Sequence, residues 1–165
     1  TQGVSSAASD VYKRQEHVFK NKIENTLFAG IYNEEIFREL KNKKNKIVIK
    51  DNISKKKISI SIDKFYLKND NAIVISNNNT VIFTKYRKPF HYLSDFRELN
   101  INLKNYKILI VKSGYLSPEL KKLKADNFMI LTDGFVTQDF KRIKNLFREK
   151  PIYPFQKNFR YNIAI

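Results

Sequence analysis

The chain has no cysteine among its 165 residues, and only two histidines, four glycines and four prolines. The lack of cysteine excludes disulfide bonds, thiolate metal sites and a cysteine nucleophile. No apolar run approaches the roughly 20 residues that a membrane-spanning helix needs, so we expect no membrane partner. No secretory signal is visible either. These absences are compatible with a cytoplasmic location, which we therefore expect.

Several motifs that carry chemistry are also missing. The sequence has no P-loop, no GxGxxG and no aromatic signature of an RNA-binding domain. Its two histidines, His17 and His91, lie far apart, and no group of histidines or carboxylates has the spacing of metal ligands. We therefore expect no complete zinc site and no cofactor within this chain, and no catalysis by the chain alone.

The charge is strongly basic, with a formal net value of +16 and a pI near 9.9. One interpretation is a small basic α/β module that binds nucleic acid. The other is composition, because lysine, asparagine and isoleucine are all abundant and all have AT-rich codons. We favour the second and expect no specific nucleic-acid partner. A gel shift across a salt series separates the two, because charge alone gives sequence-tolerant binding that vanishes near physiological salt.

The first 15 residues differ from the rest in being rich in serine and alanine. Their last six, DVYKRQ, resemble the translation of a transposon-end adapter from sequencing libraries, a common scar in metagenomic assemblies. We therefore interpret residues 1–15 as a non-native tail and expect an upstream part of the protein to be missing. The remaining chain is divided into a helical lead-in (16–45), an α/β domain (46–157) and a C-terminal tail (158–165).

The first half of the α/β domain has the patterns of antiparallel strands. KIVIK at 46–50 and KISISI at 57–62 alternate polar and apolar residues, with the period of half-buried strands. AIVIS at 72–76 and TVIFTKY at 80–86 are joined by asparagines, which tolerate the left-handed conformations of tight turns. The two segments are therefore predicted to form a hairpin.

Three helix starts are indicated by capping residues. Asn33 precedes an acidic first turn, which predicts a helix near 34–43. Ser94 is a candidate cap for the short helix DFREL. Ser117, followed by Pro118 and Glu119, predicts a helix to about Leu123.

The second half changes pattern. ILIV at 108–111 and FMIL at 128–131 are continuous apolar runs, typical of strands covered on both faces. Helices are predicted after each of them, the second at about 138–147, and PIYPF at 151–155 is a closing extended segment. Strand, helix, strand and helix predict a parallel βαβ unit. The expected fold is therefore α/β with mixed α+β character: N-terminal antiparallel hairpins joined to a C-terminal βαβ unit in a single compact domain.

Three loops follow predicted strands, at 85–91, 112–115 and 132–135. If those strands are parallel neighbours, the loops converge on one edge of the sheet, where ligands bind in α/β folds. Structural interpretations stay open for the residues in them. Lys112 is also the polar end of a strand, His91 is also a packed loop residue, and Ser113 has no histidine near it in sequence to activate it. Tyr115 can simply cover the core, Glu119 can pair with a helix dipole, and Asp133-Gly134 is an ordinary turn pair.

Five segments between about residues 81 and 157 resemble one family: TKYRKPFH, SDFREL, VKSGYLSPEL, LTDGFVTQDF and PIYPF. In order and spacing they are similar to the C-terminal domain of MlrC-like metallopeptidases, the microcystin-degradation type. The usual Thr-Pro-Gly loop of that family appears here as Thr132-Asp133-Gly134. The resemblance implies a two-domain, zinc-dependent hydrolase that cleaves peptide or amide bonds. It also implies that zinc and most catalytic groups belong to an N-terminal domain, which would be this chain's partner.

On this resemblance, KSGYLSPEL is expected to form a strand-to-helix corner whose Lys112, backbone amides and Tyr115 face the catalytic domain. There they would complete a cleft for a small peptide or amide substrate. The candidate cleft residues are Arg87, His91, Lys112, Ser113, Gly114, Tyr115, Asp133, Gly134 and Gln138. Two alternatives stay open: the corner only packs the two domains together, or the chain is a purely structural or dimerisation domain.

Overall fold

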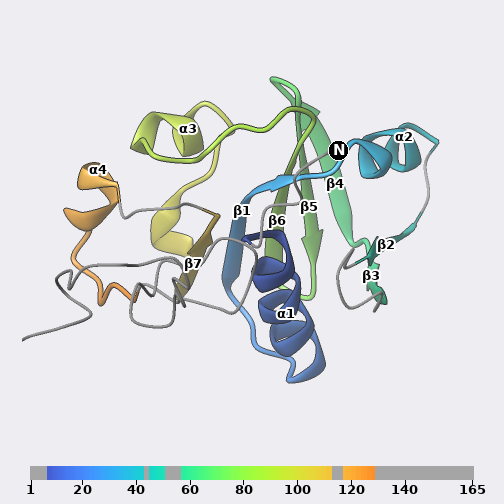
Figure 1. Ribbon diagram of the computed structural model, residues 1–165, viewed down its shortest axis with the longest axis horizontal. Helices are drawn as coiled ribbons and strands as arrows, with labels where there is room; N and C mark the ends of the chain where they lie inside the picture. Colours follow the sequence, from blue (N-terminus) through green and yellow to red (C-terminus); the bar gives the residue numbers. More distant parts are fainter. Residues whose placement is uncertain (1–6, 43–44, 51–56, 113–116, 129–165) are drawn as a thin grey trace, which may run out of the picture.

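The computed structural model describes residues 7–42, 45–50, 57–112 and 117–128 (Figure 1). Four helices, one 3-10 turn and seven strands lie in this part of the chain. In chain order they are α1 (Ala7–Lys20), β1 (Thr26–Tyr32), α2 (Glu34–Lys41), β2 (Lys46–Lys50), β3 (Lys57–Ser61), β4 (Lys64–Lys68), β5 (Asn71–Ser76), β6 (Asn79–Thr84), α3 (Leu93–Arg97), η1 (Leu103–Asn105), β7 (Ile108–Val111) and α4 (Pro118–Lys121). None of the described helices is long and apolar enough to cross a membrane.

The main sheet has five strands in the order β4-β5-β6-β1-β7, and β2 and β3 form a separate antiparallel pair. Strands β4, β5 and β6 are antiparallel neighbours, whereas β6 and β7 both run parallel to β1, on either side of it. The chain passes from β6 to β7 through α3 and η1. The expected mixture of antiparallel hairpins and a parallel unit within one α/β fold is confirmed.

The central strand was not predicted. The segment 16–45 was expected to be a helical lead-in, but it contributes β1, which lies between β6 and β7. Five of its seven residues are buried, but Ala29 and Gly30, which are both depleted in strands, interrupt the apolar run. Strand β4 was also missed. Helix α1 runs continuously through residue 15, the expected end of the non-native tail, and Gln15 is buried.

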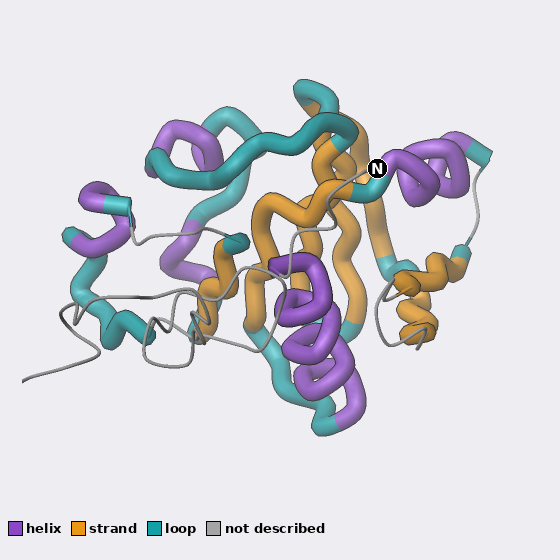
Figure 2. The backbone as a smooth tube through the Cα atoms, viewed as in Figure 1, coloured by secondary structure: helices purple, strands orange, loops and turns teal. Residues whose placement is uncertain are grey.

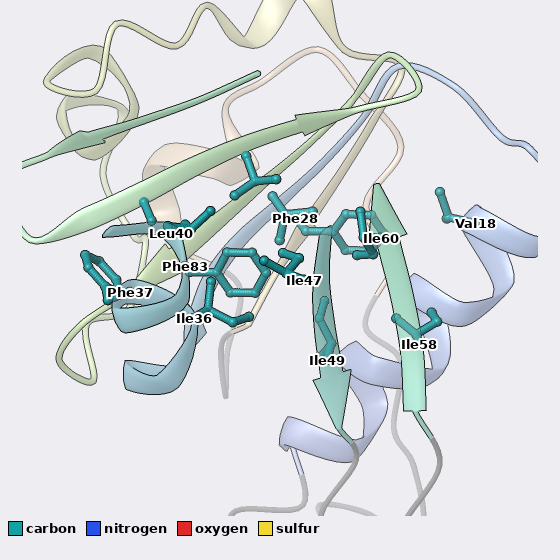
Figure 3. Close-up of a cluster of buried hydrophobic side chains, with 13 residues drawn as sticks. Val18, Phe28, Ile36, Phe37, Leu40, Ile47, Ile49, Ile58, Ile60 and Phe83 are labelled. Carbon is teal, nitrogen blue, oxygen red and sulfur yellow. The ribbon is translucent and has the colours of Figure 1, made fainter. Parts of the chain in front are cut away.

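Alternation along the strands divides the core into two clusters. One, here called the α2 face, joins Phe28 and Phe83 of the sheet to apolar side chains of α1, α2, β2 and β3. Figure 3 shows these side chains converging, with paired isoleucines of β2 and β3 among them. The other, the α3 face, joins Leu27, Ala29 and Ile82 to side chains of α3, the loop before it, and α4. The parallel part of the sheet is therefore covered on both sides.

Most predicted boundaries agree with the structure. The strands predicted at 46–50 and 108–111 are found at those residues, and Asn77 and Asn78 make the β5–β6 turn with positive φ angles of 48° and 59°. The cap at Asn33 is also confirmed, because its side chain accepts a hydrogen bond from the Ile36 amide at 3.1 Å. Helices α2 and α4 end two residues earlier than predicted.

The two continuous apolar runs of the second half, at 108–111 and 128–131, each differ from what their sequences predict at their first residue. The run at 108–111 packs against both clusters, through Ile110 on the α2 face and through Leu109 and Val111 on the α3 face, whereas its first residue, Ile108, is 41% exposed. The predicted strand at 128–131 lies outside the described residues apart from Phe128, which is 84% exposed and not in a strand. The predicted helix at 138–147 and the segment 151–155 lie wholly outside them.

Candidate functional site

The carboxyl ends of three parallel strands meet at one edge of the sheet. Strand β6 leads into the loop 85–92, β1 leads into α2, and β7 ends before Lys112. Figure 2 shows the β6–α3 loop passing over these strand ends. We call this region, made of Tyr32, loop 85–92 and Lys112, the carboxyl edge. In open α/β sheets, ligands bind outside this end of the strands.

A bulge in β1 brings the loop close to the sheet. Phe28 pairs with Val81, but the next pairing is Ile31 with Phe83, so β1 has one extra residue. Gly30 lies in this bulge with φ +78°, a conformation that glycine adopts at little cost. A Cβ atom there would lie 3.4 Å from the Lys88 carbonyl oxygen and 3.4 Å from the Phe90 ring. The glycine therefore permits a close approach between β1 and the loop.

Asp95 holds the loop in shape. Its carboxylate accepts hydrogen bonds from the backbone amides of His91 at 3.1 Å and Tyr92 at 2.9 Å. It also lies 3.0 Å from the Lys88 ammonium, and its side chain is only 9% exposed. The predicted helix cap at Ser94 is wrong, because α3 begins after Tyr92 and Asp95 accepts the amide of that capping residue.

The start of α4 is tied to the same loop. Ser117, the predicted cap of this helix, accepts a hydrogen bond from the Leu120 amide, and its hydroxyl donates to the His91 carbonyl oxygen. Glu119 accepts a hydrogen bond from the Leu93 amide at 2.8 Å, at the first residue of α3. Glu119 thus does more than pair with its own helix dipole, since it joins the ends of two helices.

Two cations flank the end of β1. The Arg87 guanidinium carbon lies 5.4 Å from the centre of the Tyr32 ring, a cation–π distance. On the other side, the Lys112 amide donates to the Ala29 carbonyl oxygen at 3.2 Å, which continues the β1–β7 pairing by one residue. Burial, together with the positive charge of Arg87, lowers the pKa of the Lys112 ammonium. The two cations are therefore close enough for the charge of one to affect the other.

The structure brings three of the nine candidate residues, Arg87, His91 and Lys112, to this edge. The backbone of His91 is fixed by Asp95 and Ser117, which agrees with its interpretation as a packed loop residue. The other six candidates lie outside the described residues: Ser113, Gly114, Tyr115, Asp133, Gly134 and Gln138.

Tyr32, Gly30 and Asp95 were not among the candidates. Asp95 had a readable signal, because an aspartate three residues after Tyr92 suits a helix start. Tyr32 and Gly30 have no such signal in the sequence, because their importance depends on the central position of β1.

The described residues do not fit a metal ion. In this part of the chain, no group of three or more histidine, cysteine, aspartate or glutamate side chains is placed to hold one. We therefore derive no reaction step through zinc. What the carboxyl edge offers is positive charge beside an aromatic ring, on a loop fixed by Asp95, Ser117 and Glu119. Such an arrangement can hold and orient an anion.

Comparison with known families adds one finding. A family model described as MlrC C-terminus matches residues 49–145, which is more than half of the chain. The match begins after β1, so the central strand of the sheet comes from outside the matched segment. A search of curated proteins found no match.

Proposed function

This chain belongs to the MlrC C-terminus family, and from that premise we propose that it is the C-terminal domain of a zinc-dependent hydrolase of peptide or amide bonds. In this proposal the zinc ion and the groups that activate water belong to a separate N-terminal domain. The present domain supplies one wall of the substrate cleft through its carboxyl edge. It is inactive when that N-terminal domain is absent.

The observation that carries the proposal is the meeting of Arg87 and Lys112 at the end of β1. Burial first, and the positive charge of Arg87 second, lower the pKa of Lys112, so its charged form is unfavourable in this place. An anion bound between them would offset the repulsion. A small peptide has such a group in its terminal carboxylate, so we assign the pair to the substrate carboxylate.

The two cations differ in what they can do. A guanidinium can bind a carboxylate with two parallel hydrogen bonds, and the Tyr32 ring beside Arg87 restricts its position. Lys112 offers a point charge from the neighbouring strand, and its amide is held by β1. Together they would fix the substrate's end and so place its scissile bond toward the metal-bearing domain.

The test uses a two-domain enzyme in which this chain, with the whole of α1, replaces the C-terminal domain of an intact family member. Replacement of Lys112 by alanine should lower kcat/KM by about 10- to 100-fold, because a hydrogen bond to a charged group is worth about 1.5–3 kcal/mol. Lys121→Ala is the matched control, since Lys121 is exposed in the last turn of α4. An unchanged kcat/KM in Lys112→Ala would discard the role.

The competing account is that the carboxyl edge only packs the two domains together. In that case Lys112→Ala loosens the interface and leaves the chemistry intact. Thermal unfolding of the two-domain protein separates the accounts. If Lys112 only packs the domains together, Lys112→Ala lowers the unfolding temperature. At temperatures where the variant is fully folded, its kcat/KM then equals that of the Lys121→Ala control.

A further inference from the structure

A hollow lies between α2 and the β4–β5 hairpin, and neither Arg87 nor Lys112 lines it. It has a volume of about 300 Å³. Its walls come from α2, from the end of β4 and the turn after it, and from Lys85, the residue that follows β6. Ligand pockets in proteins start at about this size, which suits a molecule no larger than a dipeptide.

The floor of the hollow is apolar. Phe37 of α2 is almost fully buried, with 8% of its surface exposed, and its ring belongs to the core cluster of the α2 face. Leu67 of β4 is 42% exposed, which is high for a leucine side chain. Covering Leu67 with an apolar group would stabilise a complex by the hydrophobic effect.

The rim carries charged side chains of both signs, of which some are paired with each other and others are not. The Lys85 ammonium lies 3.7 Å from the Asp70 carboxylate, and the Lys85 amide donates to the Asp70 carbonyl oxygen, so these two residues are already paired. Arg38, Lys68 and Glu34 also line the hollow. In the described part of the chain, these three side chains make no ion pair or hydrogen bond.

We propose that this hollow is a binding site for an amino acid or short peptide with a free amino group and a free carboxylate. The carboxylate would pair with Arg38 and Lys68, the ammonium with Glu34, and an apolar side chain would lie on Phe37 and Leu67. A phosphate fits less well, because Glu34 and Asp70 would repel its second negative charge. The site shares Lys85 with the loop 85–92 of the carboxyl edge but does not include Arg87 or Lys112, so it can be tested separately from the proposed function.

The experiment titrates the full 165-residue chain with the dipeptide alanyl-leucine by isothermal titration calorimetry and by NMR. We expect a dissociation constant on the order of 1 mM, typical of a small, open site. The N-acetylated dipeptide and the C-terminal amide should each bind at least about tenfold more weakly, because each lacks one of the two charges. Amide shifts should be confined to α2, the β4–β5 hairpin and the residues around Lys85.

Two variants assign the charges to residues. Arg38→Gln should weaken the dipeptide about tenfold but leave the already weak C-terminal amide unchanged. Glu34→Gln should weaken the dipeptide with its free amine about tenfold and leave the binding of the N-acetylated dipeptide unchanged. Arg97→Gln, an exposed arginine of α3, is the matched control and should bind like the wild type.

Three results overturn the inference: no saturable binding at about ten times the expected dissociation constant, equal binding of the capped and free dipeptides, or Arg38→Gln binding as tightly as Arg97→Gln. If Arg38→Gln unfolds, Lys68→Gln replaces it with the same expected loss. None of these results bears on Lys112 and the cleft, which are tested by catalysis.

Discussion

The α2 face and the carboxyl edge are held together by different forces. On the α2 face, helices α1 and α2 and the pair β2–β3 pack apolar side chains on Phe28 and Phe83, all of them nearly or fully buried. At the carboxyl edge, the contacts are polar: Asp95, Ser117 and Glu119 satisfy backbone groups of the loop and of α3. The first region is built to be stable, and the second is built to keep a particular shape.

The difference also separates stability from function. Apolar burial contributes free energy but has little directional preference, whereas hydrogen bonds to backbone amides fix where a loop lies. Within the described residues, the tyrosines that are exposed lie at the carboxyl edge beside Arg87 and Lys112, with Tyr32 at 41%, Tyr86 at 60% and Tyr92 at 58% exposure. Substitutions should therefore have large effects on stability at the α2 face and large effects on activity at the carboxyl edge.

The largest loss of stability should come from the α2 face. Phe83→Ala removes a fully buried ring at the centre of the cluster. We expect the free energy of unfolding to fall by about 3–5 kcal/mol, the usual range for truncation of a buried phenylalanine. Denaturant titration followed by circular dichroism measures it.

The control for this loss is Tyr86→Ala, another aromatic truncation only three residues away but 60% exposed. It should change the free energy of unfolding by no more than about 0.5 kcal/mol. Equal losses in the two variants would contradict the contrast between the α2 face and the carboxyl edge.

A smaller loss is expected at the carboxyl edge from Asp95→Ala. The change leaves the His91 and Tyr92 amides without their acceptor and removes the partner of Lys88. We expect a cost of about 1–2 kcal/mol, since two part-buried amides lose a charged acceptor. Hydrogen exchange should speed up at those two amides more than at Ile82 in β6; uniform acceleration would mean that Asp95 acts only on global stability.

Gly30→Ala probes the contact between the two regions. A Cβ at φ +78° is strained and meets Lys88 and Phe90. We expect a cost of about 1–2 kcal/mol, the penalty of a left-handed conformation for an L-residue. The matched control is Ala72→Gly, a buried alanine of β5 in the cluster of the α2 face, which should be destabilising without shifting the NMR signals of loop 85–92. If Gly30→Ala leaves the free energy of unfolding unchanged, the claim that the bulge requires a glycine is wrong.

The smallest effect concerns Lys112, and it has the opposite sign. Because the folded state lowers the pKa of Lys112, the unfolded state binds the proton more tightly, and the charge at neutral pH destabilises the folded chain. Lys112→Met should therefore raise the free energy of unfolding at pH 7. The gain should shrink as the pH rises through the lowered pKa of folded Lys112, and it should be gone above the ordinary lysine pKa of about 10.4, where the unfolded chain has also lost this proton.

Difference titrations of the variant and the wild type from pH 7 to high pH check this, because subtraction removes other alkaline groups such as Tyr66, whose pKa is raised by burial and by Tyr106. A gain that stays constant across this range would show that Lys112 is not desolvated.

The two regions also differed in how well the sequence predicted them. Strands β2, β5 and β6 have polar and apolar alternation or an asparagine turn between them, and their positions were predicted within one or two residues. Strand β1 has neither signal, and Ala29 and Gly30 interrupt its apolar residues. A pattern of one-sided burial cannot reveal the strand at the centre of a sheet.

The candidate site shows the same limit. Lys112, Arg87 and His91 follow predicted strands, so their place at one edge could be expected from the rule for parallel strands. The roles of Asp95 and Glu119 depend on which backbone amides lie near them, and this requires coordinates. Tyr32 became visible only with β1, since its ring lies at the end of that strand.

The central claim is that the carboxyl edge faces the metal-bearing domain. The chain has no cysteine, so single cysteines can be placed for spin labels, one at exposed Tyr92 and one at exposed Glu24, just before β1. The two edges are separated by roughly 20 Å, because β1 has seven residues of about 3.3 Å each. In the two-domain protein with Mn²⁺ in the metal site, electron paramagnetic resonance distances should place the label at residue 92 clearly closer to the metal than the label at residue 24. Equal distances, or a shorter distance from residue 24, would contradict the account.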